Sequence, residues 1–500
     1  MGKNYTVTMP VDMNGSASPY KQLQQLTAEA HLPEHILCED QQTIFLNKRL
    51  RLLPKKRLVA LCTFQGKPAV AKIFFHRFHA HKHFQREING SNRLLELNIP
   101  HPSILYLGKT ADRQVYVIIY EKIAASNLAD YLHKCHTLIT AMPILKLLMI
   151  ELATQHVIGL CQNDLHLDNY LVTSNKIYTL DGANISFQND KISRLTSIKN
   201  LALLLSQLGT NIKDYQKLLF SYYAQHRGWL VKPADLTALY FYIEQWQDSR
   251  WRRYKQKIFR NSSDNYAIKS PTQHIFCKRQ HYSASMKNFL HAPTEFLKAH
   301  PTQILKAGNS ASVFLVTIGQ QPYVVKRYNH KSWWHTVKRA YRYSRAENSW
   351  LAAHKLQLFD IATATPIALI QNYRFFLKTT AYLITLPIAG KDIKAYLQTS
   401  NVIDQQQCLL NLTDTFSSLI ELKLTHGDLK STNLLVDDNK QICLIDLDGC
   451  HEHNNINLLK RQWHKEIKRF IKNFVDTASL TILVKQFFIQ QGWLHGKTKT

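Results

Sequence analysis

Two short segments of the 500-residue chain carry the same arrangement of residues that could do phosphoryl-transfer chemistry. The segment Thr425–Val436 contains Asp428 and, five residues later, Asn433; Asp446 then follows at the end of a short apolar run. In enzymes that transfer a phosphoryl group, an Asp in the first position accepts the proton of the attacking hydroxyl, and the Asn and the second Asp hold metal ions. The spacing therefore predicts a base at Asp428 and metal ligands at Asn433 and Asp446.

Such a reaction also needs a cation that meets the phosphates of the donor. Lys326 stands in an apolar V-V-K run of the kind that supplies this cation. Glu347, in the next segment, is the best candidate to pair with the lysine. Leu305–Val316 precedes the lysine and resembles a degraded glycine-rich phosphate loop in which Gly308 is the remaining glycine.

The first half of the chain repeats this order. Cys161–Val172 again reads D-L-x-x-x-N-x-L-V, and the two copies are offset by 428 − 164 = 264 residues at the first Asp and 446 − 181 = 265 at the last. The equivalent base, metal ligands, lysine and glutamate are Asp164, Asn169, Asp181, Lys72 and Glu87. This copy has Gln162–Asn163 where the second has His-Gly, and its first hairpin contains no glycine. Its activity is therefore an open question.

The repeats must be positioned by two similar domains. In each copy apolar or alternating runs come first and helical patterns follow, which predicts an α+β fold with a small β-rich lobe and a larger helical lobe. The strands are expected at Leu58–Thr63, Ala69–Phe75, Ile104–Tyr106, Val115–Tyr120, Val313–Thr317, Tyr323–Arg327, Pro366–Ile370 and Ala381–Leu386, and the first copy's helices at Asn127–Leu132 and Ile144–Val157. We expect an N-terminal segment (1–45), two tandem protein-kinase-like domains (46–262 and 297–500) and a linker between them (263–296).

Taken singly, each residue has a simpler explanation. An Asp or Asn in this spacing is commonly a turn or cap residue, and a lysine in a strand is commonly solvated. The matched order in two copies is what favours a kinase-like fold over these explanations.

Composition narrows the class of protein. The chain has 63 Lys and Arg against 35 Asp and Glu, a net charge of +28, which favours polyanionic partners. It contains no Walker loop, no G-x-G-x-x-G and no C-x-x-C, so P-loop, dinucleotide-binding and zinc-ribbon proteins are excluded. The eight scattered cysteines fit a reducing compartment, and we expect a cytoplasmic protein with neither a signal peptide nor a spanning helix.

The motifs together resemble the bacterial lipopolysaccharide kinase family of the Kdo/WaaP and InaA type. The likeness rests on the paired QNDLHLDNYLV and HGDLKSTNLLV segments, on VVKRYNHKS, on SRAENSW and on DIATATPIAL, and extends over Arg49–Arg260 and Ile304–Phe474. It implies ATP- and Mg²⁺-dependent transfer of phosphate to a sugar hydroxyl, of heptose or Kdo, in the lipopolysaccharide inner core. Such enzymes work at the cytoplasmic face of the inner membrane.

By this resemblance Asp428 and Asp164 would be the bases, and the metal ligands and phosphate-binding lysines of both copies would keep the roles given above. Two segments that mix basic and aromatic residues, Lys326–Arg345 and Ser249–Arg260, could contact the membrane surface or the core phosphates. No nucleic-acid motif accompanies the charge, so nucleic acid is not an expected partner. Two alternatives stay open: a kinase of proteins or other small molecules, and a scaffold of two pseudokinase domains.

Overall fold

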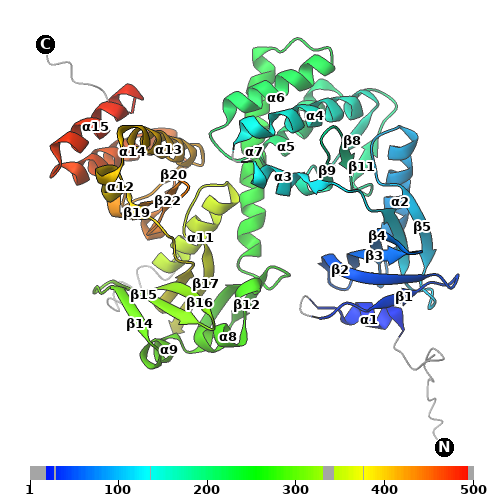
Figure 1. Ribbon diagram of the computed structural model, residues 1–500, viewed down its shortest axis with the longest axis horizontal. Coiled ribbons are helices and arrows are strands. Elements are labelled where there is room, and N and C mark those ends of the chain that lie inside the picture. The colour runs from blue at the N-terminus through cyan, green and yellow to red at the C-terminus, as the bar shows by residue number, and fades with distance from the viewer. Residues whose placement is uncertain (1–17, 28–29, 136, 330–342, 376, 494–500) are drawn as a thin grey trace, which may run out of the picture. The chain divides into compact units, whose positions relative to one another are not determined.

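The computed structural model describes residues 18–27, 30–135, 137–329, 343–375 and 377–493. The chain divides into two compact units, coloured blue to green and green to red in Figure 1. Unit 1 comprises the described residues up to Leu208 together with Asp214–Trp246, and unit 2 comprises Gly209–Lys213 and the residues from Gln247 onwards. Each unit has an antiparallel sheet followed by a mainly helical part, which confirms the predicted α+β class.

The sheet of unit 1 has six strands in the order β1-β2-β3-β4-β6-β5. Its strands are β1 (His35–Leu37), β2 (Thr43–Leu53), β3 (Arg57–Phe64), β4 (Lys67–Phe74), β5 (Ile104–Lys109) and β6 (Tyr116–Glu121), and α2 (Ala80–Glu96) connects β4 to β5. In β3 every second side chain, from Leu58 to Phe64, is buried. This period of two is what the alternating sequence requires of a strand with one face on a core.

The N-terminal segment was expected at 1–45, and its described residues, 18–27 and 30–45, are part of this sheet layer. The short helix α1 (Pro19–Gln25) buries Leu23, and β1 pairs with β2. Leu23 and Ile36 belong to the same hydrophobic cluster as the strands of the sheet. Burial of these apolar side chains is the reason that the segment joins the first domain.

The remaining part of unit 1 is mainly helical. It contains β7 (Ser126–Asn127), α3 (Leu128–Lys134), α4 (Leu138–Val157), β8 (Leu160–Gln162), β9 (Tyr170–Val172), β10 (Ile177–Thr179), β11 (Ile185–Phe187), α5 (Arg194–Leu205), α6 (Lys213–His226) and α7 (Pro233–Lys257), whose last turns belong to unit 2. Among the described helices, α4 is the one whose length and apolar composition would suffice to cross a membrane. Its buried side chains, such as Leu148 and Met149, lie inside the unit, as expected of a core helix.

The sheet of unit 2 has seven strands in the order β12-β13-β17-β18-β16-β15-β14. They are β12 (Asn265–Lys269), β13 (Gln273–Lys278), β14 (Thr302–Lys306), β15 (Ala311–Ile318), β16 (Gln321–Tyr328), β17 (Pro366–Arg374) and β18 (Leu377–Thr385), with helices α8 (Ala284–His291), α9 (Pro293–Ala299) and α11 (Arg345–Leu358). The predicted linker 263–296 is therefore wrong. Its two strands extend the sheet, and β13 pairs with β17 from Gln273 opposite Asn372 to Cys277 opposite Ala368.

The helical part of unit 2 follows β18. It contains β19 (Lys391–Asp392), α12 (Ile393–Thr399), α13 (Val402–Glu421), β20 (Leu424–Thr425), β21 (Leu434–Val436), β22 (Ile442–Leu444), β23 (His451–Glu452), α14 (Ile456–Ile471) and α15 (Ala478–Gln490). Phe416 of α13 and Trp463 of α14 lie in its core with ring centroids 5.1 Å apart. The Trp463 indole donates to the main-chain oxygen of Leu424 at 2.9 Å. This bond fixes α14 against β20, just ahead of the loop that carries Asp428.

Candidate active site

The loop between β20 and β21 brings Asp428 and Asn433 into a fixed relation. The Asn433 amide nitrogen donates to the main-chain oxygen of Asp428 at 2.8 Å, and one turn of 3₁₀-helix (Ser431–Asn433) closes the loop. The main-chain oxygen of Asn433 in turn accepts from the amide of Ile445 at 3.0 Å. The predicted base and both predicted metal ligands of the second copy are thus held together by local hydrogen bonds.

His426 and Gly427 tie this loop to the Asp446 segment. His426 is buried, and its Nε2 lies 3.0 Å from the main-chain oxygen of Ile445. Burial lowers the pKa of His426, so the ring is neutral and donates to that oxygen. Gly427 has φ +81°, and a Cβ at this residue would lie 2.1 Å from the main-chain oxygen of Gly449. Only glycine allows the two loops to approach this closely.

A carboxylate that sequence reasoning missed supports the same loop from α14. Glu466 is buried and accepts from the main-chain amides of His426 at 3.1 Å and Gly427 at 2.5 Å. Burial raises the pKa of Glu466, and these two amides oppose that effect. Its contacts are 40 and 39 residues away along the chain, so no spacing signal could have revealed them.

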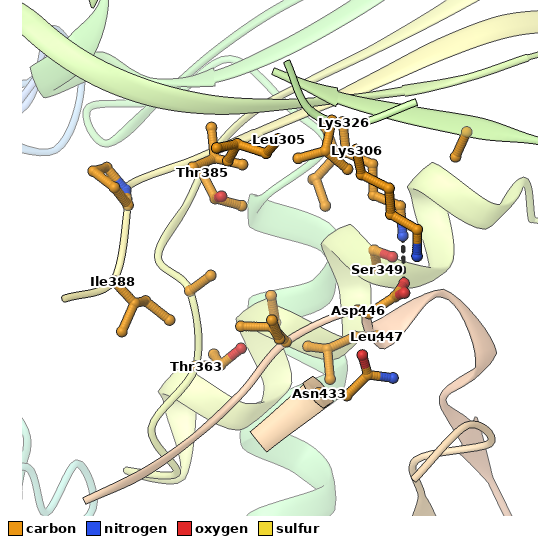
Figure 2. A pocket seen from close by; sticks show the side chains of 18 of the residues that line it. Leu305, Lys306, Lys326, Ser349, Thr363, Thr385, Ile388, Asn433, Asp446 and Leu447 are labelled. Atoms are coloured by element: carbon orange, nitrogen blue, oxygen red, sulfur yellow. Dashed lines mark hydrogen bonds and ion pairs between the residues drawn. The ribbon is translucent and has the colours of Figure 1, made fainter. Parts of the chain in front are cut away.

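Lys326 of β16 contacts the carboxylate of Asp446 directly (Figure 2). Asp446 follows β22 and has left-handed backbone angles, φ 60° and ψ 53°, which a non-glycine residue adopts at a cost of about 1–2 kcal/mol. Burial favours its neutral form, but the Lys326 ammonium, Asp448 and His426 together outweigh burial and lower the pKa of Asp446 to about 2. Asp446 is therefore an anion at neutral pH, as a carboxylate ligand of Mg²⁺ must be.

The predicted pairing of Glu347 with Lys326 is wrong. Glu347 is the third residue of α11, where its side chain accepts from the amide of Ser344 at 2.6 Å and closes a capping box. Its ion pair is with Lys378 of β18, at 2.6 Å. A glutamate in the first turn of a helix is satisfied by the free main-chain amides there, so it does not reach across to β16.

The helix position that faces the lysine is a serine in unit 2. Both α2 and α11 end in the same way: a left-handed residue (Asn98, Asp360) precedes an isoleucine whose amide bonds to the leucine five residues before it. These ends align the two helices with an offset of 360 − 98 = 262 residues. The position in α11 that is equivalent to Glu87 of α2 is therefore Ser349 (87 + 262). Ser349 lines the cavity next to Lys326 and bonds to the Tyr328 hydroxyl at 3.1 Å.

Asp448 supplies the second carboxylate near the lysine instead. Its Oδ2 lies 3.7 Å from the Lys326 Nζ and 2.6 Å from the Arg345 Nε of α11. Burial and the neighbouring Asp446 raise the pKa of Asp448, and Lys326 and Arg345 oppose this effect only in part. The sequence analysis assigned no role to Asp448, although an acidic residue two positions after Asp446 was a visible signal.

A cavity of about 640 Å³ lies between the sheet and these loops in unit 2. Lys326, Asp446 and Asn433 occupy one end, while Thr385 and Ile388 lie at the opposite, more apolar end (Figure 2). Gly308 of the β14–β15 loop also lines the cavity, as predicted for the phosphate loop, and a Cβ there would lie 2.9 Å from the main-chain oxygen of Ala311. The volume suits a nucleotide, with its charged phosphates at one end and its ring at the other.

The residues present fit a magnesium ion. Because the Asn433 amide nitrogen is engaged by Asp428, its oxygen is the atom that can meet a metal beside the ionised Asp446. Within the described ranges no group of three or more His, Cys, Asp and Glu could hold a metal by itself. Mg²⁺ is commonly bound by one or two protein oxygens together with substrate phosphates, so this small donor set is what a metal–nucleotide complex requires.

Unit 1 brings its own predicted residues together in a related way. Lys72 of β4 lies 2.5 Å from Glu87 of α2 and 3.4 Å from Asp181, so here the predicted lysine–glutamate pair is present. Burial raises the pKa of Glu87. Burial has the same tendency at Asp181, but Lys72 and then Arg57 outweigh it and lower the pKa of Asp181 to about 2.

The loop of unit 1 that carries Asp164 has the same internal bond as its counterpart. Asn169 donates its amide nitrogen to the main-chain oxygen of Asp164 at 2.9 Å. The Asp164 carboxylate lies 3.4 Å from His166 Nε2. Gln162, at the position of His426, bonds instead to the side chains of Gln155 (2.7 Å) and Tyr170 (3.0 Å), so a different buried network anchors this loop.

The segments expected to meet a membrane are described only in part. Residues 330–342, most of Lys326–Arg345, lie outside the described residues. Ser249–Arg260 forms the end of α7 and the residues after it, where Trp251 and Ile258 are buried in the core of unit 2. The Trp251 side chain is therefore packed in the core of unit 2, whereas Arg252 and Arg253 are exposed.

One comparison with known proteins supports a kinase interpretation of the second unit. Residues 306–490 match the sequence model of the lipopolysaccharide kinase (Kdo/WaaP) family, and the resemblance noted for Arg49–Arg260 stays a prediction. Curated proteins give no match. Among solved structures, the kinase domain of Mycobacterium tuberculosis PknI, in a mutant form, is similar over 45% of this chain and 99% of that domain, with 14% identity and a TM-score of 0.26. The match over residues 306–490 confirms the expected resemblance to this family for the second unit, and it supports a phosphotransferase.

Proposed function

We propose that unit 2 transfers the terminal phosphoryl group of ATP to a sugar hydroxyl, of heptose or Kdo, in the lipopolysaccharide inner core. The observation that carries the proposal is the convergence of Lys326, Asn433 and Asp446 at one end of a nucleotide-sized cavity, with Asp428 held by the same loop. The family match covers all four residues.

Each side chain has a distinct task in this reaction. When the nucleotide binds, the Lys326 ammonium would move from Asp446 to the phosphates, and Asp448 would keep the lysine oriented. A bound magnesium ion would neutralise the developing charge on the phosphates. Asp428 would accept the proton of the acceptor hydroxyl. At the same time the hydroxyl oxygen would bond to the terminal phosphorus of ATP, and ADP would leave. Lys430 lies 2.7 Å from Asp428, where it can orient the carboxylate and meet the transferred group.

We further propose that unit 1 is a second kinase-type domain, so that the chain is a tandem of two. Support comes from the buried Lys72–Glu87 pair and from the bond between Asn169 and Asp164 that matches the bond in unit 2. Whether unit 1 transfers phosphate is a separate question, because Gln162 stands at the position of His426. A unit that binds nucleotide without turnover would act as a scaffold for its neighbour.

The site of action proposed here is the cytoplasmic face of the inner membrane. The net charge of +28 favours an anionic surface and an anionic acceptor. Exposed Arg252 and Arg253 are candidates for that contact, whereas the buried Trp251 is not.

The proposal is tested by mass spectrometry of the lipopolysaccharide core from cells that lack the gene. Complementation would use the wild type, Asp428→Asn, Asp164→Asn and the control Asp438→Asn, which changes an exposed Asp in the β21–β22 turn. We expect a core phosphate to be lost and then restored by the wild type and the control but not by Asp428→Asn. An unchanged core would exclude this acceptor and favour a protein or small-molecule substrate. The Asp164→Asn strain reports whether unit 1 contributes.

A further inference from the structure

A second hollow of about 330 Å³ borders the Asp428 loop of unit 2. Its nine lining residues differ from those of the nucleotide cavity. They come from β20 and the loop after it, from the segment around β23 and from one face of α14: Thr425, Gly427, Gly449, His451, His453, Gln462, Lys465, Glu466 and Arg469. On α14 the spacing i, i+3, i+4, i+7 places its four residues on a single face.

The hollow is positively charged. Lys465 and Arg469 are exposed cations, and His451 and His453 stand beside them with ring centroids 4.8 Å apart. The one acidic residue in its lining, Glu466, is occupied by two main-chain amides. Glu452, between the histidines, is paired with Lys355 at 3.0 Å. Glu466 and Glu452 are thus engaged elsewhere, whereas the exposed Lys465 can meet an anion and Arg469 lines the hollow while it contacts Asp428.

The hollow adjoins the predicted base. An Arg469 guanidinium nitrogen lies 3.4 Å from Asp428, and Gly427 of the lining directly precedes it. Gly427 and Gly449 pack main chain against main chain where they line the hollow, so neither residue places a side chain in it. An anionic group in the hollow would therefore lie next to the carboxylate that receives the hydroxyl proton.

We propose that this hollow binds an anionic substituent, a phosphate or a carboxylate, of the acceptor and thereby positions the acceptor's hydroxyl at Asp428. The inference rests on the kinase function proposed for unit 2 and names the class of acceptor, an acidic sugar or glycan. Arg469 is the positioning residue that links the hollow to the base, and Lys465 and the two histidines bind the anion.

The binding step is tested first, without turnover. The full-length protein is acetylated at lysines, and mass spectrometry follows Lys465 and, as an internal control, Lys468, which is exposed on the same helix but does not line the hollow. The probes are glucose 1-phosphate, galacturonate and glucose. We expect slower acetylation of Lys465 with one or both of the charged sugars, of Lys468 with none, and no effect of glucose. Equal rates at Lys465 with all three probes would overturn the proposal.

Kinetics with deacylated core oligosaccharide test the positioning step. Loss of one charge-assisted contact in Lys465→Gln should raise the acceptor KM about tenfold and leave the KM for ATP unchanged, with Lys468→Gln as the matched control. Equal KM values in the two variants would refute the proposal while leaving the kinase function intact. If no phosphate is transferred to the core at all, the kinase function fails, and the acetylation experiment still decides the binding site.

Discussion

The partner of Lys326 gives the sharpest test of the site. Two carboxylates are candidates to orient this lysine: Glu347, which the sequence suggested, and Asp448, which the structure places 3.7 Å from its Nζ. Replacing each by its amide changes charge without changing size. The two variants, Glu347→Gln and Asp448→Asn, should therefore fail in different ways.

Glu347→Gln should lower stability and leave nucleotide binding unchanged. A glutamine keeps the capping box with Ser344 but loses the ion pair with Lys378, which is worth about 1 kcal/mol at a partly exposed position. For a unit of this size the melting temperature should fall by about 2–4 °C. Differential scanning calorimetry measures this shift.

Asp448→Asn should weaken the binding of ATP with Mg²⁺. Without Asp448, Lys326 pairs only with Asp446. The lysine that should bind the phosphates and the carboxylate that should bind the metal then neutralise each other. Loss of one charge-assisted contact of about 1.5 kcal/mol corresponds to roughly a tenfold rise in the Kd, measured by isothermal titration calorimetry. Ser349→Glu, which places a carboxylate at the position of Glu87, should recover part of the loss in the double variant. The reasoning is refuted if Glu347→Gln weakens nucleotide binding as much as Asp448→Asn does.

Three further outcomes follow from the geometry. Glu87→Gln removes the nearer of the two carboxylates that contact Lys72 and leaves Asp181 as its partner, so the thermal transition of unit 1 should lose about 1.5–3 kcal/mol, and an unchanged transition in calorimetry would contradict the buried pair. Gly427→Ala would place a Cβ 2.1 Å from the oxygen of Gly449, so phosphate transfer should be lost; wild-type turnover in a kinase assay would show that the loops are not packed this way. Burial lowers the pKa of both His101 and His156 to about 4, so the unfolded chain binds more protons than the folded one between about pH 6.5 and 4. The free energy of unfolding should therefore fall as the pH is lowered from about 6.5 to 4, by up to about 1.4 kcal/mol per pH unit for each histidine, and a denaturant series should show a shallower slope in His156→Gln.

Local features of the site were predictable from the sequence. The bond from Asn433 to the main chain of Asp428 spans five residues, so the D-x-x-x-x-N spacing by itself contains that geometry. The strand that carries Lys326 was equally visible, because its apolar residues form a short run that pairs with its neighbours in sequence.

Contacts between distant segments were not predictable. Glu347 is the nearest glutamate after Lys326, but the register of α11 is fixed at its other end, by the left-handed Asp360. Of the two strands in the expected linker, β13 pairs with β17, about a hundred residues away, and β12 pairs with β13. The sequence Asn265–Lys278 alternates too weakly to be identified alone. Likewise Glu466 meets His426 only because α14 packs beneath the loop.

The position of β12 and β13 in the second sheet has a practical consequence for dividing the chain. A shorter polypeptide that begins at residue 297, where the sequence suggested the domain starts, would remove both strands and leave β17 at the edge of the sheet. The buried residues of β17, such as Ile367 and Leu369, would then lie beside a row of unpaired amides and carbonyls, which is a template for aggregation. An independently soluble second half should instead begin no later than Gln247, so that Trp251 and Ile258 also remain in its core.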